Sequence, residues 1–208
     1  MKDLKYLYEF EKLLESANNP LVQQACAEGK HALAYTCYHM PEVLLNTGDC
    51  FSVRLRAPLT GSLDISSYYM SNFICDYCKS LLERGIEGGY NFLSGLMGTE
   101  TCSEMNRALE HFELLHLVDN EQFFVTFLDM PFKVTENTVR HYVDQLRRKV
   151  LTPLHEVYGV DVSDDALRKA VAEHNEVCRI LTEIGQFRKE ENPRICLLYT
   201  SPSPRDCS

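Results

Sequence analysis

The 208-residue sequence has little positive charge and no long apolar run. Lys and Arg number 21 against 30 Asp and Glu, which gives a formal net charge of −9 and a pI near 5.3. No stretch is dense enough in Lys and Arg to neutralise a run of phosphates, so the composition argues against nucleic-acid binding. No apolar run approaches the roughly 18 residues that cross a bilayer, and charges interrupt the N-terminal stretch where a signal peptide would need an apolar core. We therefore predict a cytoplasmic protein with no membrane association.

The common nucleotide and hydrolase motifs are also missing. The sequence contains no GxxxxGK[ST] phosphate loop, no GxGxxG after a strand, no HExxH and no GxSxG. The histidines are dispersed, and His111 and His116 do not share a helix face as a metal pair would. ATP hydrolysis by this chain is therefore not predicted, and the histidines are interpreted as structural or solvent-exposed.

Apolar residues and cysteines, by contrast, are abundant. Hydrophobic residues make up 45% of the chain, enough to bury one ordinary core. Nine cysteines occur without a secretion signal, so metal binding, redox chemistry or simple burial must explain them.

The last residues, Cys196 to Ser208, do not continue the pattern of the rest. They read CLLYTSPSPRDCS, have no helical or strand period, and resemble the translation of a transposon-end sequencing adapter. We interpret residues 196–208 as a non-native tail that makes few contacts with the body. The natural protein is then expected to continue past Ile195, so this chain is interpreted as an N-terminal fragment.

Hydrophobic periodicity predicts an α/β fold with a parallel sheet, flanking helices and then a helical pair. We expect N-terminal helices in residues 1–30, an α/β domain in 31–134 and a helical pair packed as a hairpin on the sheet in 135–190. Within the middle region, strands are predicted at 31–38, 50–55, 92–97 and 121–128, and helices at 41–48, 66–88 and 101–118. In the last region, Pro153 is expected to kink or end the first helix, and Ser163 to cap the second.

Two cysteines lie where parallel sheets place their sites. Cys37 ends a predicted strand, at the carboxyl edge of the sheet. Cys102 opens a helix whose capping box is Thr101 to Glu104, and a helix N-terminus favours a thiolate or an anionic cluster. Together with Cys75, these residues could converge on one metal centre.

Cys75 also forms a CxxC pair with Cys78. The pair falls inside the predicted 66–88 helix, which disfavours a thioredoxin-type dithiol, and it lacks a second pair for a zinc site. Burial of at least one of the two is an equal alternative. We expect Cys75 and Cys102 to approach each other, and Cys26 and Cys178 to stay away from them.

Several segments together resemble the 2-hydroxyacyl-CoA dehydratase family, which includes the 2-hydroxyglutaryl-CoA dehydratase D-component and benzoyl-CoA reductase subunits. They are TCYHMPEVLLNTGDCFSVRLRAP, the segment ICDYCKSLLERG that contains Cys75, the T-C-x-x-M segment at Thr101, and FLDMP. The resemblance covers roughly Asn19 to Glu183 and implies a two-domain α/β subunit about twice this length, so that the second α/β domain is missing here.

The resemblance further implies a [4Fe-4S] cluster held by three cysteines, with one iron left open. The ligands carried over are Cys75 and Cys102, and the third would lie in the missing C-terminal half. Cys37 falls beside the open iron, and Glu42 is a candidate polar group near it; as a helix N-terminal acid, Glu42 has an equally good structural explanation. Cys78 departs from the family motif, which leaves open whether Cys75 or Cys78 is the ligand.

The implied activity is a lyase reaction on a 2-hydroxyacyl-CoA. An ATP-dependent iron–sulfur activator injects an electron, a ketyl radical anion expels the 2-hydroxyl group, and the enoyl-CoA is formed. The implied partners are the acyl-CoA substrate, a homologous second subunit that completes a heterodimer, and the activator. The fragment itself is expected to be inactive. The alternatives are a benzoyl-CoA reductase-type or double-cluster reductase subunit, or a non-catalytic paralogue that serves as a scaffold.

Overall fold

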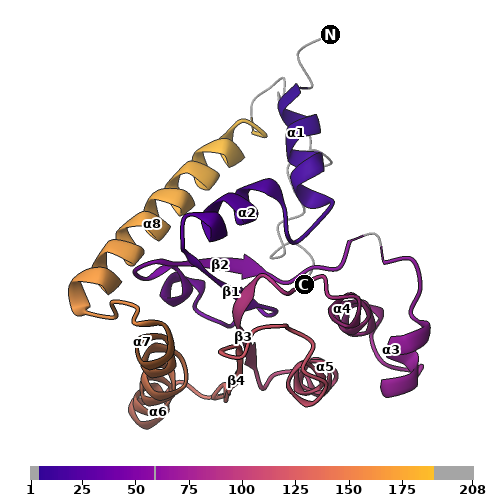
Figure 1. Ribbon diagram of the computed structural model, residues 1–208. Coiled ribbons are helices and arrows are strands. Elements are labelled where there is room, and N and C mark those ends of the chain that lie inside the picture. Colours follow the sequence, from indigo (N-terminus) through magenta and orange to yellow (C-terminus); the bar gives the residue numbers. More distant parts are fainter. Residues whose placement is uncertain (1–4, 59, 190–208) are drawn as a thin grey trace.

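The computed structural model describes residues 5–58 and 60–189, and it shows a parallel sheet between two layers of helices (Figure 1). All four predicted strands form, and all neighbouring strands are parallel. The predicted α/β class is confirmed. The strands are β1 (His31–Tyr35), β2 (Cys50–Arg54), β3 (Leu93–Thr99) and β4 (Phe124–Leu128).

The order of the strands across the sheet is β2-β1-β3-β4. The chain passes from β1 to β2 on one side, then crosses back to β3 on the other side of β1. The carboxyl ends of β1 and β3 therefore flank a topological switch point, the place where open α/β sheets bind ligands.

One face of the sheet is covered by α2 (Pro20–Ala27), α4 (Asp76–Ile86) and α5 (Ser103–Leu114). α5 approaches β3 closely at Gly98, where a Cβ atom would overlap the Leu109 side chain. The fully buried residues of this layer include Ala34, Leu81, Leu82, Leu96, Leu109 and Phe112.

The other face packs against three shorter segments. They are the 3-10 helix η1 (Glu42–Asn46), the π-helical turn η2 (Arg147–Leu151) and α7 (Thr152–Tyr158). The fully buried residues of this second layer include Leu33, Leu45, Met97, Leu128, Val150 and Leu154.

The prediction of a single helix over residues 66–88 is wrong. The chain forms α3 (Asp64–Tyr69), leaves the helix at Met70 and re-enters α4 at Asp76. Met70 has an extended backbone and is 3% exposed, so the break buries its side chain in the core. Ser71 then forms a turn in which its carbonyl accepts from the N–H of Ile74. The helix predicted at 41–48 is likewise shorter, since only the 3-10 turn η1 forms.

The C-terminal helical region begins with α6 (Glu136–Leu146), which runs through η2 into α7 without a break. Pro153 does not end the helix. It lies at the start of α7, directly after the π-helical turn, where the regular helical hydrogen-bond pattern is already altered.

α8 (Asp164–Gln186) begins where the sequence predicted, because the Ser163 hydroxyl accepts from the N–H of Ala166. α6 and η2 contact β4, whereas α8 contacts η1 and extends toward α1 (Lys5–Leu14) in Figure 1. The two helical segments therefore contact different parts of the molecule instead of packing along each other as a hairpin. No helix among the described residues is long and apolar enough to cross a membrane. The predicted tail, 196–208, lies outside those residues.

Candidate functional site

The loops that follow β1 and β3 meet at the switch point. Cys37 comes two residues after β1, and Cys102 directly precedes α5 after β3. The Cys37 Sγ lies 3.8 Å from the Thr101 Oγ1, and Thr101 in turn lies 3.2 Å from the Thr99 Oγ1. This part of the site was predicted from the strand ends.

The CxxC pair lies at the start of α4 and not in the middle of a longer helix. Cys75 is the residue before the first helical residue, and Cys78 lies in the first turn. No helix precedes Cys75 directly, so the argument against a redox pair from its position inside a 66–88 helix does not hold.

Glu104 joins the two helix starts. The predicted capping box does not form: the residue that precedes α5 is Cys102, and its side chain makes no capping hydrogen bond. The Glu104 Oε2 instead accepts the backbone N–H of Cys75 at 2.8 Å. As a result, one sulfur each from Cys75 and Cys78 and a carboxylate oxygen of Glu104 lie within 4.8 Å of one another.

The four cysteines differ in exposure. Cys75 and Cys102 are exposed, Cys37 is half-buried, and Cys78 is 2% exposed. Burial, with smaller contributions from the nearby thiols of Cys75 and Cys102, raises the pKa of Cys78 to about 12. Both exposed cysteines therefore lie close to Cys78, while Cys26 and Cys178 are on α2 and α8.

Tyr77 lies beside Cys78 in the first turn of α4. Its hydroxyl donates to the Leu55 carbonyl at 2.7 Å. Burial raises its pKa; Arg54 opposes this shift, and Cys78 and Cys37 add smaller contributions to it. Cys37 is thus linked electrostatically to the α4 side of the site as well as to Thr101.

Soft thiolate sulfurs are the donors that iron–sulfur centres use, and several meet here beside one carboxylate. These cysteine sulfurs, two of them from exposed residues, are donors that fit an iron–sulfur cluster. Sequence reasoning missed the role of Glu104, although the signal was present: its position two residues after Cys102 was interpreted as a capping box. Thr36, next to Cys37, is 3% exposed and its hydroxyl has no hydrogen-bond partner among the described residues.

Glu42 makes its described contacts elsewhere. Its Oε2 accepts from the Tyr35 hydroxyl at 2.5 Å, and its Oε1 lies 3.6 Å from the His174 Nδ1. These contacts place the carboxylate between η1 and α8, and its role beside the cysteines stays a prediction.

Comparison with known proteins gives a consistent result. The family described as 2-hydroxyglutaryl-CoA dehydratase, D-component, matches residues 37–201. The (R)-phenyllactyl-CoA dehydratase beta subunit of Clostridium sporogenes is 22% identical over 183 residues, which are 88% of this chain and 48% of that protein. The (R)-2-hydroxyglutaryl-CoA dehydratase subunit beta of Acidaminococcus fermentans is 23% identical over 184 residues, which are 84% of this chain and 47% of that protein.

The chain spans about half the length of these curated relatives. The family match covers most of the chain, includes Cys37, Cys75, Cys78 and Cys102, and extends past Ile195. The resemblance predicted from the sequence is confirmed, and the chain belongs to the 2-hydroxyglutaryl-CoA dehydratase D-component family.

Proposed function

We propose that this chain is part of a 2-hydroxyacyl-CoA dehydratase subunit, and that its cysteine site holds a [4Fe-4S] cluster. The observation that supports this proposal is the meeting of Cys37, Cys75, Cys78 and Cys102 at the switch point of a parallel sheet, in a member of this family.

Cys75 and Cys102 are the proposed ligands. Both are exposed, so their sulfurs are accessible to a cluster at the edge of the sheet. Cys78 is 2% exposed, so its sulfur is less accessible than those of Cys75 and Cys102 from the edge of the sheet. Cys78 then acts as a small packing residue behind the ligands, and the third ligand comes from outside this chain.

A cluster with three protein ligands supplies an iron with an exchangeable coordination site and a one-electron couple. The chain's own residues hold and orient the reactants around it. Glu104 fixes the Cys75 backbone through its hydrogen bond to the N–H. Cys37 and the Thr101 hydroxyl border the site on the β1 and β3 side, where they can orient a polar group of the substrate.

The substrate we propose is a 2-hydroxyacyl-CoA thioester, since the names of both relatives specify dehydratases of such compounds. Because both relatives are beta subunits, we propose a homologous second subunit as partner. A separate ATP-hydrolysing activator would deliver the electron, which agrees with the absence of a phosphate-binding loop in the sequence.

The test uses the subunit at the full length of its relatives, purified anaerobically with its second subunit. We expect iron and acid-labile sulfide in the preparation and, with activator and ATP, conversion of a 2-hydroxyacyl-CoA to the enoyl-CoA. Protein without iron and sulfide would instead support a scaffold paralogue whose cysteines are only packing residues.

A further inference from the structure

A second group of reactive side chains lies between η1 and α8, outside the cysteine site at the switch point. His174 and Cys178 are four residues apart in α8 and therefore lie on one face of the helix. The Cys178 Sγ lies 3.5 Å from the His174 Nε2, and the His174 Nδ1 lies 3.6 Å from the Glu42 Oε1. One imidazole ring thus connects a thiol to a carboxylate through its two nitrogens.

The position of the carboxylate is set by the sheet. Its second oxygen accepts from the hydroxyl of Tyr35, the last residue of β1. The Glu42 side chain is 30% exposed and that of His174 is 28% exposed, so water only partly screens the pair. A carboxylate at ion-pair distance from Nδ1 stabilises the imidazolium that forms when Nε2 accepts the thiol proton.

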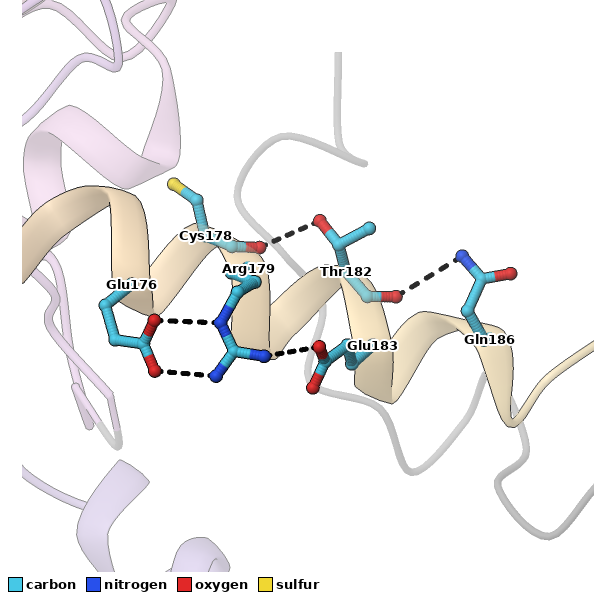
Figure 2. A network of polar contacts seen from close by, with 6 residues as sticks. All are labelled: Glu176, Cys178, Arg179, Thr182, Glu183 and Gln186. Carbon is cyan, nitrogen blue, oxygen red and sulfur yellow. Dashed lines mark hydrogen bonds and ion pairs between the residues drawn. The ribbon is translucent and has the colours of Figure 1, made fainter.

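The thiol is partly exposed and points away from the ion pairs of the helix. Cys178 is half-buried, and Figure 2 shows its side chain projecting away from the ion pairs of Glu176, Arg179 and Glu183. The Arg179 guanidinium binds both oxygens of Glu176, at 2.8 and 2.6 Å, and also contacts Glu183. Among the residues that the structure describes, the Cys178 sulfur makes its polar contact with the His174 Nε2.

We propose that Cys178, His174 and Glu42 form a thiol-exchange site for small disulfides. The thiol proton moves to the His174 Nε2, and Glu42 stabilises the imidazolium. The thiolate attacks one sulfur of a disulfide RSSR, forms a Cys178–S–S–R bond and displaces RS⁻. The disulfide is the oxidant: it is reduced to one released thiolate while Cys178 is oxidised to the mixed disulfide.

The experiment exposes the 208-residue chain to glutathione disulfide and follows each cysteine by site-resolved mass spectrometry. Cys26 is the internal control because it is also half-buried, and burial raises its pKa. We expect Cys178 to react about tenfold faster than Cys26 or more. His174→Gln should reduce the Cys178 rate to that of Cys26, and Glu42→Gln should slow it several-fold.

The matched control variant is Glu173→Gln, which removes a carboxylate of the same helix that pairs with Lys169. We expect it to leave the Cys178 rate unchanged. If wild-type Cys178 reacts no faster than Cys26, or if His174→Gln leaves its rate unchanged, the contacts only attach α8 to η1 and the proposal is wrong. Comparison of two cysteines in the wild-type chain keeps the test valid even if a variant folds poorly.

Discussion

At the scale of single residues, exposure separates cysteines that the sequence treats alike. Cys75 and Cys78 belong to one CxxC pair, yet the first is exposed and the second is buried at the start of the same helix. A metal centre at the sheet edge needs accessible thiolates, whereas the core needs a small apolar side chain. One motif therefore supplies a proposed ligand and a packing residue.

The ligand assignment predicts different effects for the two positions. In the full-length subunit, Cys75→Ser and Cys102→Ser should each lower the iron content severely, because a serine hydroxyl is a poor substitute for a thiolate on iron. Cys78→Ser should keep most of the iron, and iron analysis after anaerobic purification checks all three. The opposite result, in which Cys78→Ser abolishes iron binding and Cys75→Ser does not, would reverse the assignment.

A buried thiol in β2 predicts a loss of stability at high pH. Burial raises the pKa of Cys50 to about 12, whereas an unfolded cysteine titrates near about 8.5. Between these values the unfolded state has lost a proton that the native state keeps, so the free energy of unfolding falls by up to about 1.4 kcal/mol per pH unit.

Cys50→Ala should have a flatter dependence over that range and the same slope as wild type at neutral pH. Urea titrations at a series of pH values measure both slopes. Parallel curves for the two proteins up to the alkaline limit would show that Cys50 does not contribute in this way.

At the scale of elements, close contacts between helices and strands position the site. Gly98 allows α5 to pack directly on β3, and α5 begins at the Cys102 loop. On the other side of the sheet, Gln145 of α6 binds the backbone of Asp129, directly after β4. A side chain added at Gly98 or removed at Gln145 therefore changes how a helix and a strand end fit together.

Gly98→Ala should destabilise the fold by about 1–3 kcal/mol, because the new methyl group displaces the fully buried Leu109. Gly61→Ala is the matched control, since a Cβ there meets no atom within 4 Å. Chemical denaturation measures both changes. Equal stabilities of the two variants would contradict the close packing of α5 on β3. In a Leu109→Ala background, where the clashing side chain is gone, the cost of Gly98→Ala should be smaller.

Gln145→Ala should cost about 1–3 kcal/mol. The Gln145 side chain is 2% exposed, accepts the Asp129 N–H at 3.0 Å and donates to the Asp129 carbonyl at 3.0 Å. Gln24→Ala, which removes an exposed amide paired with Glu28, should change the stability by much less. Thermal unfolding of the two variants compares them, and equal shifts would mean that solvent satisfies the Asp129 backbone after the substitution.

At the scale of the whole molecule, the chain provides one sheet with its helices and spans about half the length of its relatives. The proposed site draws its residues from loops after two central strands and from the start of α4. Its exposed edge is where a further ligand and the substrate would approach.

We expect the isolated 208-residue chain to show no ATP-dependent dehydration of a 2-hydroxyacyl-CoA when its activator is supplied. The proposed cluster has only two of its three ligands in this chain, so iron sites would be open to solvent and oxidation. The full-length heterodimer, assayed in parallel, serves as the positive control. Turnover by the isolated chain above the background of the Cys102→Ser variant would contradict this expectation.

The sequence by itself determined the fold class, the approximate place of all four strands and the cap of α8. These features depend on local periodicity, on turn residues and on single capping side chains such as Ser163, which act within a few residues of the chain. The family and the cysteines of interest also followed from motifs read along the sequence.

Only the tertiary structure decided which thiols are exposed, where the 66–88 segment breaks, and what Glu42 and Glu104 bind. The break depends on the burial of Met70, and the partner of Glu104 is a backbone N–H 29 residues away in sequence. Glu42 and His174 are still further apart along the chain. Local sequence patterns do not predict such contacts, because the contacts form only when the sheet brings distant segments together. Burial then favours one of several conformations that are equally compatible with the local sequence.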